Sequence, residues 1–255
     1  AYERLVSRDP KVFTTSGQWM TERTGGSDVS RTSTVATPVE GSDRQYLLNG
    51  YKFFTSATTS GMAFALGRIQ EPGQALPLGN RGLSCFYLEM KGNGEGAAPF
   101  YHAASAAGNQ AGTHPSIKVH RLKDKLGTRA LPTAEVELVD TPAYLVGTKE
   151  RGIPIISEMF NITRIHNAIS SVALLHRALA IAKDFSTKRY AFGKTLVDQP
   201  LHMKTLAAIQ VELEACMHVT FYAISLLGLS ECGKLDKRQT ILLRILMPLI
   251  KLYTA

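Results

Sequence analysis

The 255-residue sequence contains few cysteines and no close pair of them. Its three cysteines, Cys85, Cys216 and Cys232, are odd in number and lack the spacing of zinc ligands. This pattern favours packing roles in a reducing compartment over disulfides or a metal site. We therefore expect an intracellular protein without a metal, in the cytoplasm, mitochondrion or peroxisome.

The sequence also lacks a long uninterrupted apolar run. Residues 241–253 are too few to span a bilayer and include Arg244 and Lys251. Residues 1–11 are polar and mixed in charge, unlike a secretory signal. With 44% hydrophobic and 20% charged residues, the composition is that of a globular protein with a substantial core. No membrane partner is expected.

Acidic residues are outnumbered by basic ones, which gives a formal net charge of +8. A basic surface can bind nucleic acid or small anionic ligands, or can simply keep a protein in solution. The densest basic segment, residues 118–129, is interleaved with apolar residues at strand spacing. No helix-turn-helix, zinc-finger or RNA-recognition signature accompanies it.

Residues 17–148 have the texture of a β domain, because short β-rich runs are broken by Gly, Pro, Asn and Ser. Strands are predicted at residues 32–39, 46–48, 51–55, 62–69, 83–90, 117–122 and 133–139. Asn49-Gly50 separates two of these runs and predicts a hairpin with a type I′ turn. Strands without intervening helices favour a closed or sandwiched antiparallel sheet.

Residues 91–116 are rich in Gly, Ala, Asn and Pro and are predicted to form a long loop. The run GNGEG at residues 92–96 superficially matches a dinucleotide-binding fingerprint. No amphipathic helix follows it, so we reject a Rossmann fold.

From about residue 149 the apolar period changes to 3.6, which is typical of helices. A long helix is predicted to begin near Pro154, a second to cover residues 201–227, and a third to begin near Lys237. The third is still in mid-pattern at Ala255. We therefore expect an incomplete helical bundle and a sequence that is a fragment.

Residues 20–29 (MTERTGGSDV) place hydroxyls and acids around a paired-glycine turn. Gly25 and Gly26 allow positive φ and a close approach of backbone to a ligand. Successive N–H groups in such a turn can converge on an anion such as a pyrophosphate. Thr21 and Ser27 add hydroxyls on either side. Taken alone, the same residues are more often a surface turn capped by Asp28.

Four segments, in order, resemble motifs of the flavin-dependent acyl-CoA dehydrogenases. Residues 20–29 resemble the signature V-T-E-x-x-x-G-S-D-V, and residues 49–56 (NGYKFFTS) resemble the strand behind the flavin ring. Residues 125–129 (KLGTR), with Glu135 and Asp140, resemble K-x-G-x-R…E…D, and residues 189–194 (RYAFGK) resemble R-x-x-F-G-K. The Phe-Phe pair and the segment 121–129 are most similar to the AidB-like branch.

The resemblance implies an α+β fold, in which an antiparallel β-barrel or sandwich middle domain precedes an incomplete up-down helical bundle. Residues 1–16 would be a linker from a missing N-terminal helical domain. Residues 17–148 would be the flavin-binding middle domain, and residues 149–255 part of the C-terminal bundle. It also implies a homo-oligomer, a dimer or tetramer.

The resemblance implies FAD as cofactor and assigns roles to residues of the first half. Thr21 would bond the pyrimidine edge of the flavin, and Gly26 and Ser27 would lie near its pyrophosphate. Phe54 would pack against the isoalloxazine, or be simple strand core, and the Ser56 hydroxyl would meet N5 or O4. The neighbouring residues included in the same cofactor site are Met20 and Thr55.

Residues at the corner between the first two long helices are implied to reach FAD of a neighbouring subunit. Arg189 would contact the pyrophosphate, although an Arg after a helix is also a common solvated charge. Phe192 belongs to the same motif. Gln199 is a weaker match, since the Gln of the family pattern stands displaced here.

The implied reaction removes a proton from Cα of an acyl-CoA thioester and needs a carboxylate base. In one branch this base is a Glu directly before the Arg of the first long helix, but here Thr163 precedes Arg164. In the other branch it comes from a part of the C-terminal domain beyond Ala255. No catalytic base is therefore expected in the chain. Arg164 would support that base or belong to a structural ion pair, and Asn161 stands where many members carry Asp.

We thus expect a flavin-dependent acyl-CoA dehydrogenase whose substrate is an acyl-CoA, here a fragment with weak or no FAD retention and no turnover. The alternative is an AidB-like, DNA-associated flavoprotein with vestigial dehydrogenase activity and duplex DNA as partner. An acyl-CoA oxidase would differ in letting oxygen reach the reduced flavin. The sequence does not specify the acyl-chain length.

Overall fold

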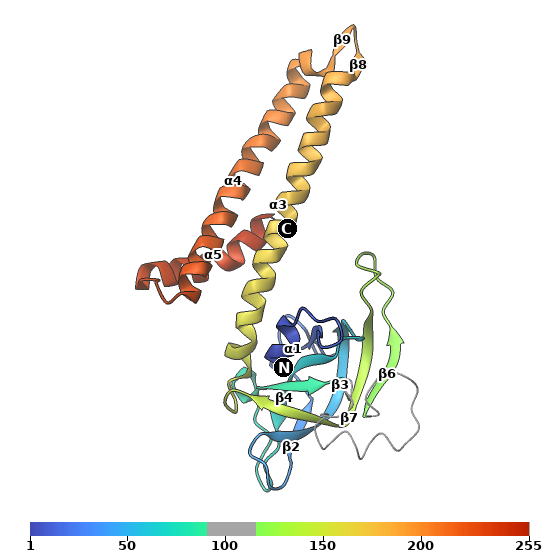
Figure 1. Cartoon of the computed structure of the whole chain (residues 1–255), viewed down its shortest axis with the longest axis vertical. Coiled ribbons are helices and arrows are strands. Elements are labelled where there is room, and N and C mark those ends of the chain that lie inside the picture. Colours follow the sequence, from blue (N-terminus) through green and yellow to red (C-terminus); the bar gives the residue numbers. More distant parts are fainter. Residues whose placement is uncertain (91–115, 255) are drawn as a thin grey trace. The chain divides into compact units, whose positions relative to one another are not determined.

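A computed structural model describes residues 1–90 and 116–254 of the chain (Figure 1). The chain divides into two compact units, Ala1–Ile156 and Ser157–Ala255, which we describe separately. The loop predicted at residues 91–116 and the GNGEG run lie almost entirely outside the described residues. The domain boundary predicted at residues 148 and 149 stays a prediction.

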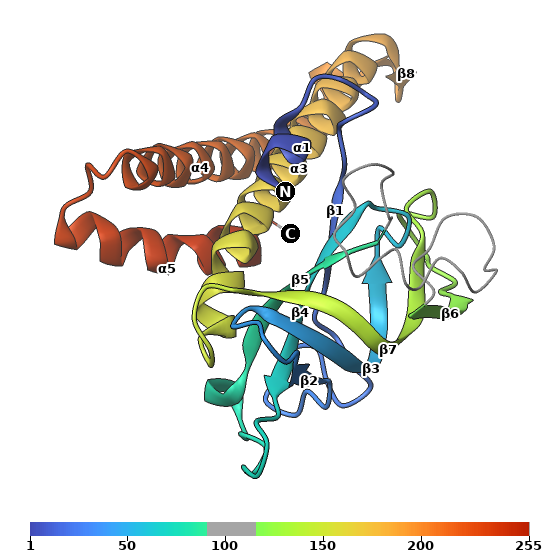
Figure 2. The same ribbon diagram turned by 60° about the horizontal axis from the view of Figure 1, so that its bottom comes forward.

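The first unit is a β-barrel with two attached strands (Figure 2). Strands β2, β3, β7, β5 and β4 pair in that order, and β4 returns to pair with β2, which closes the ring. Strand β1 adds to β4, and β6 adds to β7. The bounds are β1 Ser16–Trp19, β2 Val35–Pro38, β3 Gln45–Ser56, β4 Met62–Ile69, β5 Ser84–Glu89, β6 Ile117–Leu122 and β7 Thr133–Val146, with the short helices α1 Tyr2–Val6 and η1 Asn80–Gly82.

The α+β class and the closed sheet are confirmed, but the sheet is mixed rather than purely antiparallel. Both β1 and β2 run parallel to β4, while the remaining pairs are antiparallel. Alternate residues of the barrel strands point inward and form one apolar core, as expected for a closed sheet. That core includes Trp19, Leu48, Phe86, Leu88, Val136 and Leu138.

The hairpin predicted at Asn49-Gly50 is wrong, because β3 continues straight through these residues. A Cβ on Gly50 would lie only 2.4 Å from Oγ1 of Thr34, so glycine lets β3 pass close to the neighbouring backbone. The Asn49 side chain donates to the Asp140 carboxylate at 2.7 Å and accepts from the Asp140 N–H at 3.0 Å. Instead of a turn, the pairing has a β-bulge here, in which Val139 and Asp140 of β7 together oppose the single residue Asn49.

The second unit is built from the three predicted helices. Helix α3 (Gly152–Lys188) leads to a small hairpin of β8 (Tyr190–Ala191) and β9 (Lys194–Thr195), then to η3 (Leu196–Asp198), α4 (Pro200–Glu231) and α5 (Lys237–Thr254). Apolar residues of all three helices form shared clusters, as the 3.6 period requires. The buried members are Ile165, Ala168, Val172, Leu179, Leu206, Leu213, Cys216, Ala223, Leu226, Leu243, Met247 and Ile250.

By length and composition alone, α3 and α4 are each apolar enough to cross a membrane. The expectation that no segment is long enough was therefore too strong. Core helices of water-soluble proteins meet the same criterion, and both helices contribute buried residues to the clusters of the second unit.

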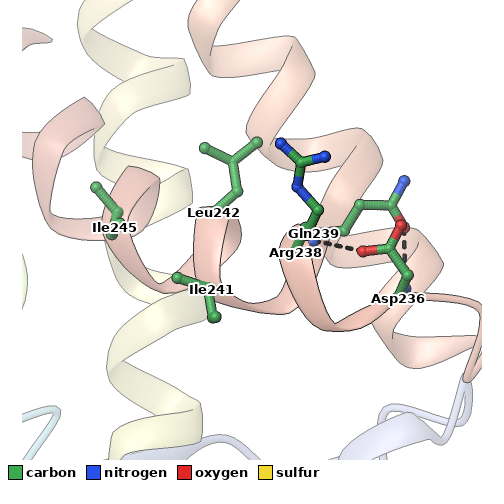
Figure 3. A pocket seen from close by; sticks show the side chains of 6 residues that line it. All are labelled: Asp236, Arg238, Gln239, Ile241, Leu242 and Ile245. Atoms are coloured by element: carbon green, nitrogen blue, oxygen red, sulfur yellow. Dashed lines mark hydrogen bonds between the residues drawn. The ribbon is translucent and has the colours of Figure 1, made fainter.

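Helix α5 carries a surface hollow of about 540 Å³ lined by Asp236, Arg238, Gln239, Ile241, Leu242 and Ile245 (Figure 3). Two of its polar residues, Asp236 and Gln239, cap the helix. The Gln239 N–H donates to the Asp236 carboxylate at 2.8 Å, and the Asp236 N–H donates to the Gln239 side chain at 3.0 Å. This is the reciprocal arrangement of a capping box.

Candidate functional site

The glycine turn and the end of β3 lie side by side in the first unit. The Phe53 N–H donates to the Thr21 carbonyl at 2.9 Å. The indole N–H of the fully buried Trp19 donates to the Ser56 carbonyl at 3.2 Å. The structure therefore brings together the two segments that the sequence assigned to one site.

The turn itself requires its glycines. Gly25 has a φ of +154°, and a Cβ there would lie 2.6 Å from the Asp28 carbonyl. A Cβ on Gly26 would lie 2.9 Å from the Thr21 Cγ2 and 3.0 Å from its Oγ1. The absence of side chains thus leaves open the space beside the Thr21 hydroxyl. Within the described ranges, the hydroxyls of Thr21 and Ser27 have no protein partner, so both remain available to a ligand.

Asp28 closes the turn, as the simpler interpretation of this segment predicted. Its carboxylate accepts from the N–H and the hydroxyl of Ser30, both at 2.9 Å. These hydrogen bonds hold the pKa of Asp28 below its usual value. Capping by Asp28 and anion binding by the turn use different groups, so the two interpretations are compatible.

A buried ion pair fastens the turn to the barrel. The Lys52 ammonium lies 2.8 Å from the Glu22 carboxylate, and both side chains are almost completely buried. Glu22 also accepts from the N–H and hydroxyl groups of Ser33 and Thr34, and Lys52 donates to the Leu66 carbonyl at 2.8 Å. Each charged group thus has several partners in a low-dielectric interior.

The ionisation of this pair follows from its surroundings. Burial by itself raises the pKa of Glu22, but the charge of Lys52 and the hydrogen bonds from Lys52, Ser33 and Thr34 outweigh it and lower that pKa to about 2. Burial lowers the pKa of Lys52, and the charge of Glu22 opposes this change. Neither residue was placed in the site from the sequence. One signal in the sequence could have found them. Lys52 stands at an inward position of an alternating strand, and a buried lysine needs a buried partner of opposite charge.

A β-bulge places two aromatic rings on the outer face of the sheet. Lys52 pairs with Val136 and Thr55 pairs with Ala134, so Phe53 and Phe54 together oppose the single residue Glu135. The two rings meet edge to face, with centroids 5.1 Å apart. Phe54 remains 45% exposed.

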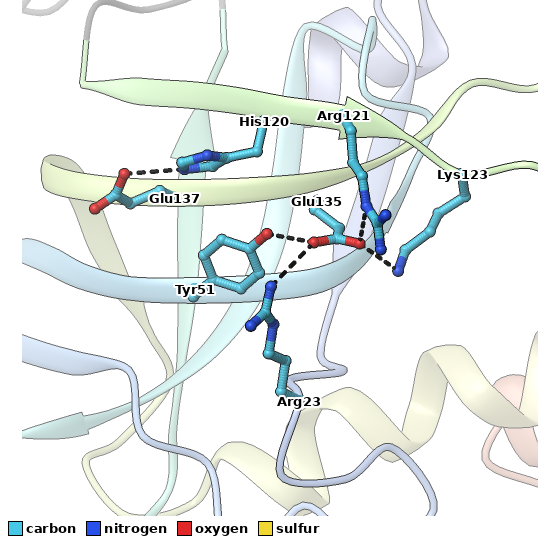
Figure 4. Close-up of polar contacts among 7 residues, drawn as sticks. All are labelled: Arg23, Tyr51, His120, Arg121, Lys123, Glu135 and Glu137. Carbon is cyan, nitrogen blue, oxygen red and sulfur yellow. Dashed lines mark hydrogen bonds and ion pairs between the residues drawn. The ribbon is translucent and has the colours of Figure 1, made fainter.

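Glu135, the residue opposite Phe53 and Phe54, is the centre of a polar cluster (Figure 4). Its carboxylate accepts from the Tyr51 hydroxyl, from Lys123 at 2.8 Å and from Arg121 at 2.6 Å, and pairs with Arg23 at 3.5 Å. The hydrogen bonds from Lys123 and Tyr51 contribute most to holding the pKa of Glu135 far below its usual range. The side chain therefore remains a carboxylate at neutral pH.

Lys123 and Arg23 connect this cluster to the aromatic rings. The Lys123 ammonium lies 3.2 Å from the Phe53 centroid and 4.3 Å from that of Phe54, and the Arg23 guanidinium lies 4.8 Å from the Tyr51 centroid. These are cation–π contacts that support the rings from one side. Since Arg23 belongs to the glycine turn, Glu135 also ties that turn to β7.

Ser56 follows Phe54 by two residues at the end of β3. Its Oγ lies 2.9 Å from Oγ1 of Thr133, the residue opposite it on β7. The Thr55 side chain, by contrast, is fully buried and donates to the Ala134 carbonyl at 2.8 Å. Met20 is also buried, at 7% exposure. The hydroxyl of Thr55 is thus unavailable to a ligand on the face of Phe54.

The remaining predicted residues belong to the second unit. Phe192 is 96% exposed at the tip of the β8–β9 hairpin, with a φ of +52°. Arg189 is exposed beside this hairpin, where its carbonyl accepts from the Leu196 N–H at 3.0 Å. Gln199 donates to the Ala191 carbonyl at 3.1 Å, which stabilises the hairpin. Its side-chain amide is therefore partly engaged.

Arg164 lies on α3 and donates to the Asn161 side chain at 3.2 Å. Thr163 uses its hydroxyl on the Phe160 carbonyl within the same helix. Glu158 is exposed on that helix. Among the described residues flanking Arg164 on α3, no carboxylate pairs with its guanidinium.

Two domain families match almost the whole chain. The acyl-CoA dehydrogenase middle domain matches residues 17–141, and the acyl-CoA dehydrogenase C-terminal domain matches residues 150–255. The chain belongs to the acyl-CoA dehydrogenase family. Members of this family are FAD-dependent oxidoreductases. The match places the barrel in the middle domain of the family and the helices in its C-terminal domain.

Relatives within the acyl-CoA dehydrogenase family include both animal and bacterial proteins. Acyl-CoA dehydrogenase family member 11 of Caenorhabditis elegans is 43% identical over 99% of this chain. The putative acyl-CoA dehydrogenase AidB of Escherichia coli is 34% identical over 78% of it. The crystal structure of C. elegans ACDH-11 in complex with C11-CoA superimposes on 99% of this chain, with a TM-score of 0.85 and 42% identity.

The chain spans less than half the length of these relatives. It covers 38% of the C. elegans sequence, 31% of AidB and 40% of the ACDH-11 chain in the crystal. The DNA-associated alternative gains no support from these comparisons, because these relatives are described as acyl-CoA dehydrogenases or as binding an acyl-CoA.

Proposed function

We propose that this chain supplies the flavin-binding face of an FAD-dependent acyl-CoA dehydrogenase that converts an acyl-CoA to its α,β-unsaturated product. The observation that carries the proposal is the exposed Phe54 ring at the end of β3, the strand segment that also carries Ser56 and is hydrogen-bonded to Thr21 before the glycine turn. A flat aromatic ligand can stack on the ring, and the hydroxyls can bond its polar edge.

The described residues fit FAD in three respects. Gly25 and Gly26 leave a cradle that a Cβ would fill, which suits a pyrophosphate against backbone N–H groups and the Ser27 hydroxyl. Thr21 has an unpartnered hydroxyl for the pyrimidine edge, and Phe54 and Ser56 offer a stacking face and a donor. When bound, FAD would supply the hydride acceptor of the reaction. The chain's own residues bind and orient it.

The substrate class follows from the relatives. ACDH-11 was crystallised with C11-CoA, and we propose that an acyl-CoA is also the substrate here. Thr163 cannot serve as a carboxylate base, so Arg164 would support a base from elsewhere in the assembled enzyme. We also propose that Arg189 and Phe192, exposed on their hairpin, contact FAD of a second subunit. A reducing intracellular location agrees with three free cysteines.

The exposed face of the Phe54 ring, which we call the stacking face, can be tested by titrating the chain with FAD and following flavin fluorescence. Because a pyrophosphate contact from a second subunit is part of the proposal, we expect binding to be weak. Phe54→Ala should weaken it by about tenfold, since one aromatic contact contributes about 1 kcal/mol or more.

Phe13→Ala is the matched control, because Phe13 is 49% exposed in the same unit but lies outside the proposed face. It should leave the affinity unchanged. Equal effects of Phe54→Ala and Phe13→Ala would refute the stacking face.

A further inference from the structure

A chain of polar contacts runs behind Ser56, and the family resemblance gave it no role. The Lys125 ammonium donates to the Thr128 carbonyl at 2.7 Å, to the Leu131 carbonyl, and to Oγ1 of Thr133 at 3.2 Å. Thr133 is 3% exposed, and its Oγ1 lies 2.9 Å from the Ser56 Oγ. The Thr133 hydroxyl thus contacts both Lys125, from the loop between β6 and β7, and Ser56, from the end of β3.

The donors and acceptors in this chain determine its direction. An ammonium has three N–H donors and no acceptor, so Lys125 can only donate, and its three acceptors account for all three protons. Thr133 therefore receives a charge-assisted hydrogen bond on one lone pair. A hydroxyl that accepts from a cation becomes a better donor, which favours donation from Thr133 to Ser56.

The consequence concerns the proton of Ser56. If Thr133 donates to the Ser56 Oγ, the Ser56 O–H is not used within the protein. In the part of the chain that the structure describes, Thr133 is the one side-chain partner of that hydroxyl. Its proton is then free to be donated to an acceptor on the face of Phe54.

We propose that Thr133 and Lys125 are positioning residues that orient Ser56 as a hydrogen-bond donor toward an acceptor atom of the bound flavin ring. This inference rests on the proposed function, because it takes the ligand on the Phe54 face to be a flavin. It assigns to the lysine of the KLGTR segment a role that acts through two hydroxyls rather than by direct contact.

The first test uses the ligand-free chain and reads the Ser56 side chain by NMR. Three-bond couplings report its χ1 rotamer, which should be single in the native chain. Thr133→Val and Lys125→Met should each give an averaged rotamer, while Thr133→Ser should restore the single one. Thr141→Val is the matched control, because Thr141 lies on the same strand, is fully buried and loses a hydrogen bond to the Ser116 carbonyl. An unchanged Ser56 rotamer in both test variants would overturn the proposal.

The second test is a double-mutant cycle on FAD affinity. Thr133→Val and Ser56→Ala should each weaken binding by about fivefold, the effect of one hydrogen bond. The double variant should bind no more weakly than Ser56→Ala alone, because Thr133 acts through Ser56. A purely structural role of Thr133 would instead make the loss of FAD affinity in the double variant the product of the two single losses. That result would contradict the proposal.

The two tests separate the two proposals. If the native chain binds no FAD, the proposed flavin site fails, and the rotamer measurement alone decides whether Thr133 and Lys125 orient Ser56. If FAD binds and the cycle is additive, the flavin site stands and the positioning role fails. Lys125 is only partly buried, so Lys125→Met remains usable if Thr133→Val does not fold.

Discussion

Replacing Lys52 by methionine should destabilise the barrel more than any other substitution of a lysine in the first unit. The variant leaves the Glu22 carboxylate buried without its cationic partner. Breaking a buried pair from one side costs about 3–5 kcal/mol. That is a large part of the total stability of about 5–15 kcal/mol for a typical domain.

Because the Lys52–Glu22 pair includes a titrating carboxylate, the loss of stability in Lys52→Met should depend on pH. The pKa of Glu22 is lowered from 4.5 to about 2, which corresponds to roughly 3 kcal/mol of stability. Because the folded-state pKa is the lower one, this contribution is fully present above pH 4.5 and is lost as the pH falls through about 2. In Lys52→Met, burial instead favours the protonated acid. The difference between the two proteins should therefore narrow from pH 7 to pH 3.

The assay is urea unfolding followed by the fluorescence of Trp19, the one tryptophan, which is fully buried in the barrel. Lys118→Met is the matched control, because Lys118 is an exposed lysine of the same sheet. It should change the free energy of unfolding by less than about 0.5 kcal/mol. The free energy of unfolding should differ strongly between the native and the Lys52→Met protein at pH 7 and less at pH 3. A small difference at pH 7, or one that is equally large at pH 3, would refute the role of the ion pair.

Three further substitutions test the geometry. Gly26→Ala should weaken FAD binding at least tenfold, because its Cβ would lie 2.9 Å from the Thr21 side chain, whereas Gly127→Ala, with open space around it, should bind like the native chain. Gly50→Ala should lower the free energy of unfolding by about 2–3 kcal/mol, since its Cβ would meet Thr34 at 2.4 Å; a stability near that of the native chain would contradict the close passage of β3. Glu135→Gln should release Lys123 from the rings of Phe53 and Phe54, so the ring-current shifts of the Lys123 methylene protons should disappear at pH 7; their persistence would show that Glu135 does not hold the lysine.

The helices were predictable because a 3.6 period extends over many residues and local punctuation agrees with it. Pro200 opens α4, and Asp236 with Gln239 caps α5. The closed sheet was also predictable from regularly spaced strands. In each case the signal lies within one segment of sequence.

Asn49-Gly50 shows where such local signals fail. The dipeptide favours a turn, but pairing of the same strand with both β2 and β7 overrides that preference. Glycine is needed there for contact with Thr34, and asparagine for contact with Asp140, 91 residues away. Sequence proximity gave no indication of either contact.

In the candidate site, too, some residues could be predicted from the sequence and others could not. Resemblance to the family located Thr21, Gly26, Phe54 and Ser56, which lie on two adjacent segments. It did not locate Lys52, Lys123 or Thr133, because their roles depend on partners from other strands. The buried side chain of Thr55 became evident only from the structure, since the bulge at Phe53 and Phe54 changes which residues face outward.

We propose that one face of the barrel, formed by the glycine turn and the end of β3, binds FAD. The most direct measurement is an NMR titration of the native chain with FAD up to about 1 mM, where a binding free energy of about −4 kcal/mol is detectable. We expect the amide shifts to change at Thr21, Gly26, Ser27, Phe54 and Ser56, and the amide shifts of Ile241, Leu242 and Ile245, which line the hollow on α5, to stay unchanged. Shifts elsewhere with none at these five residues would contradict it.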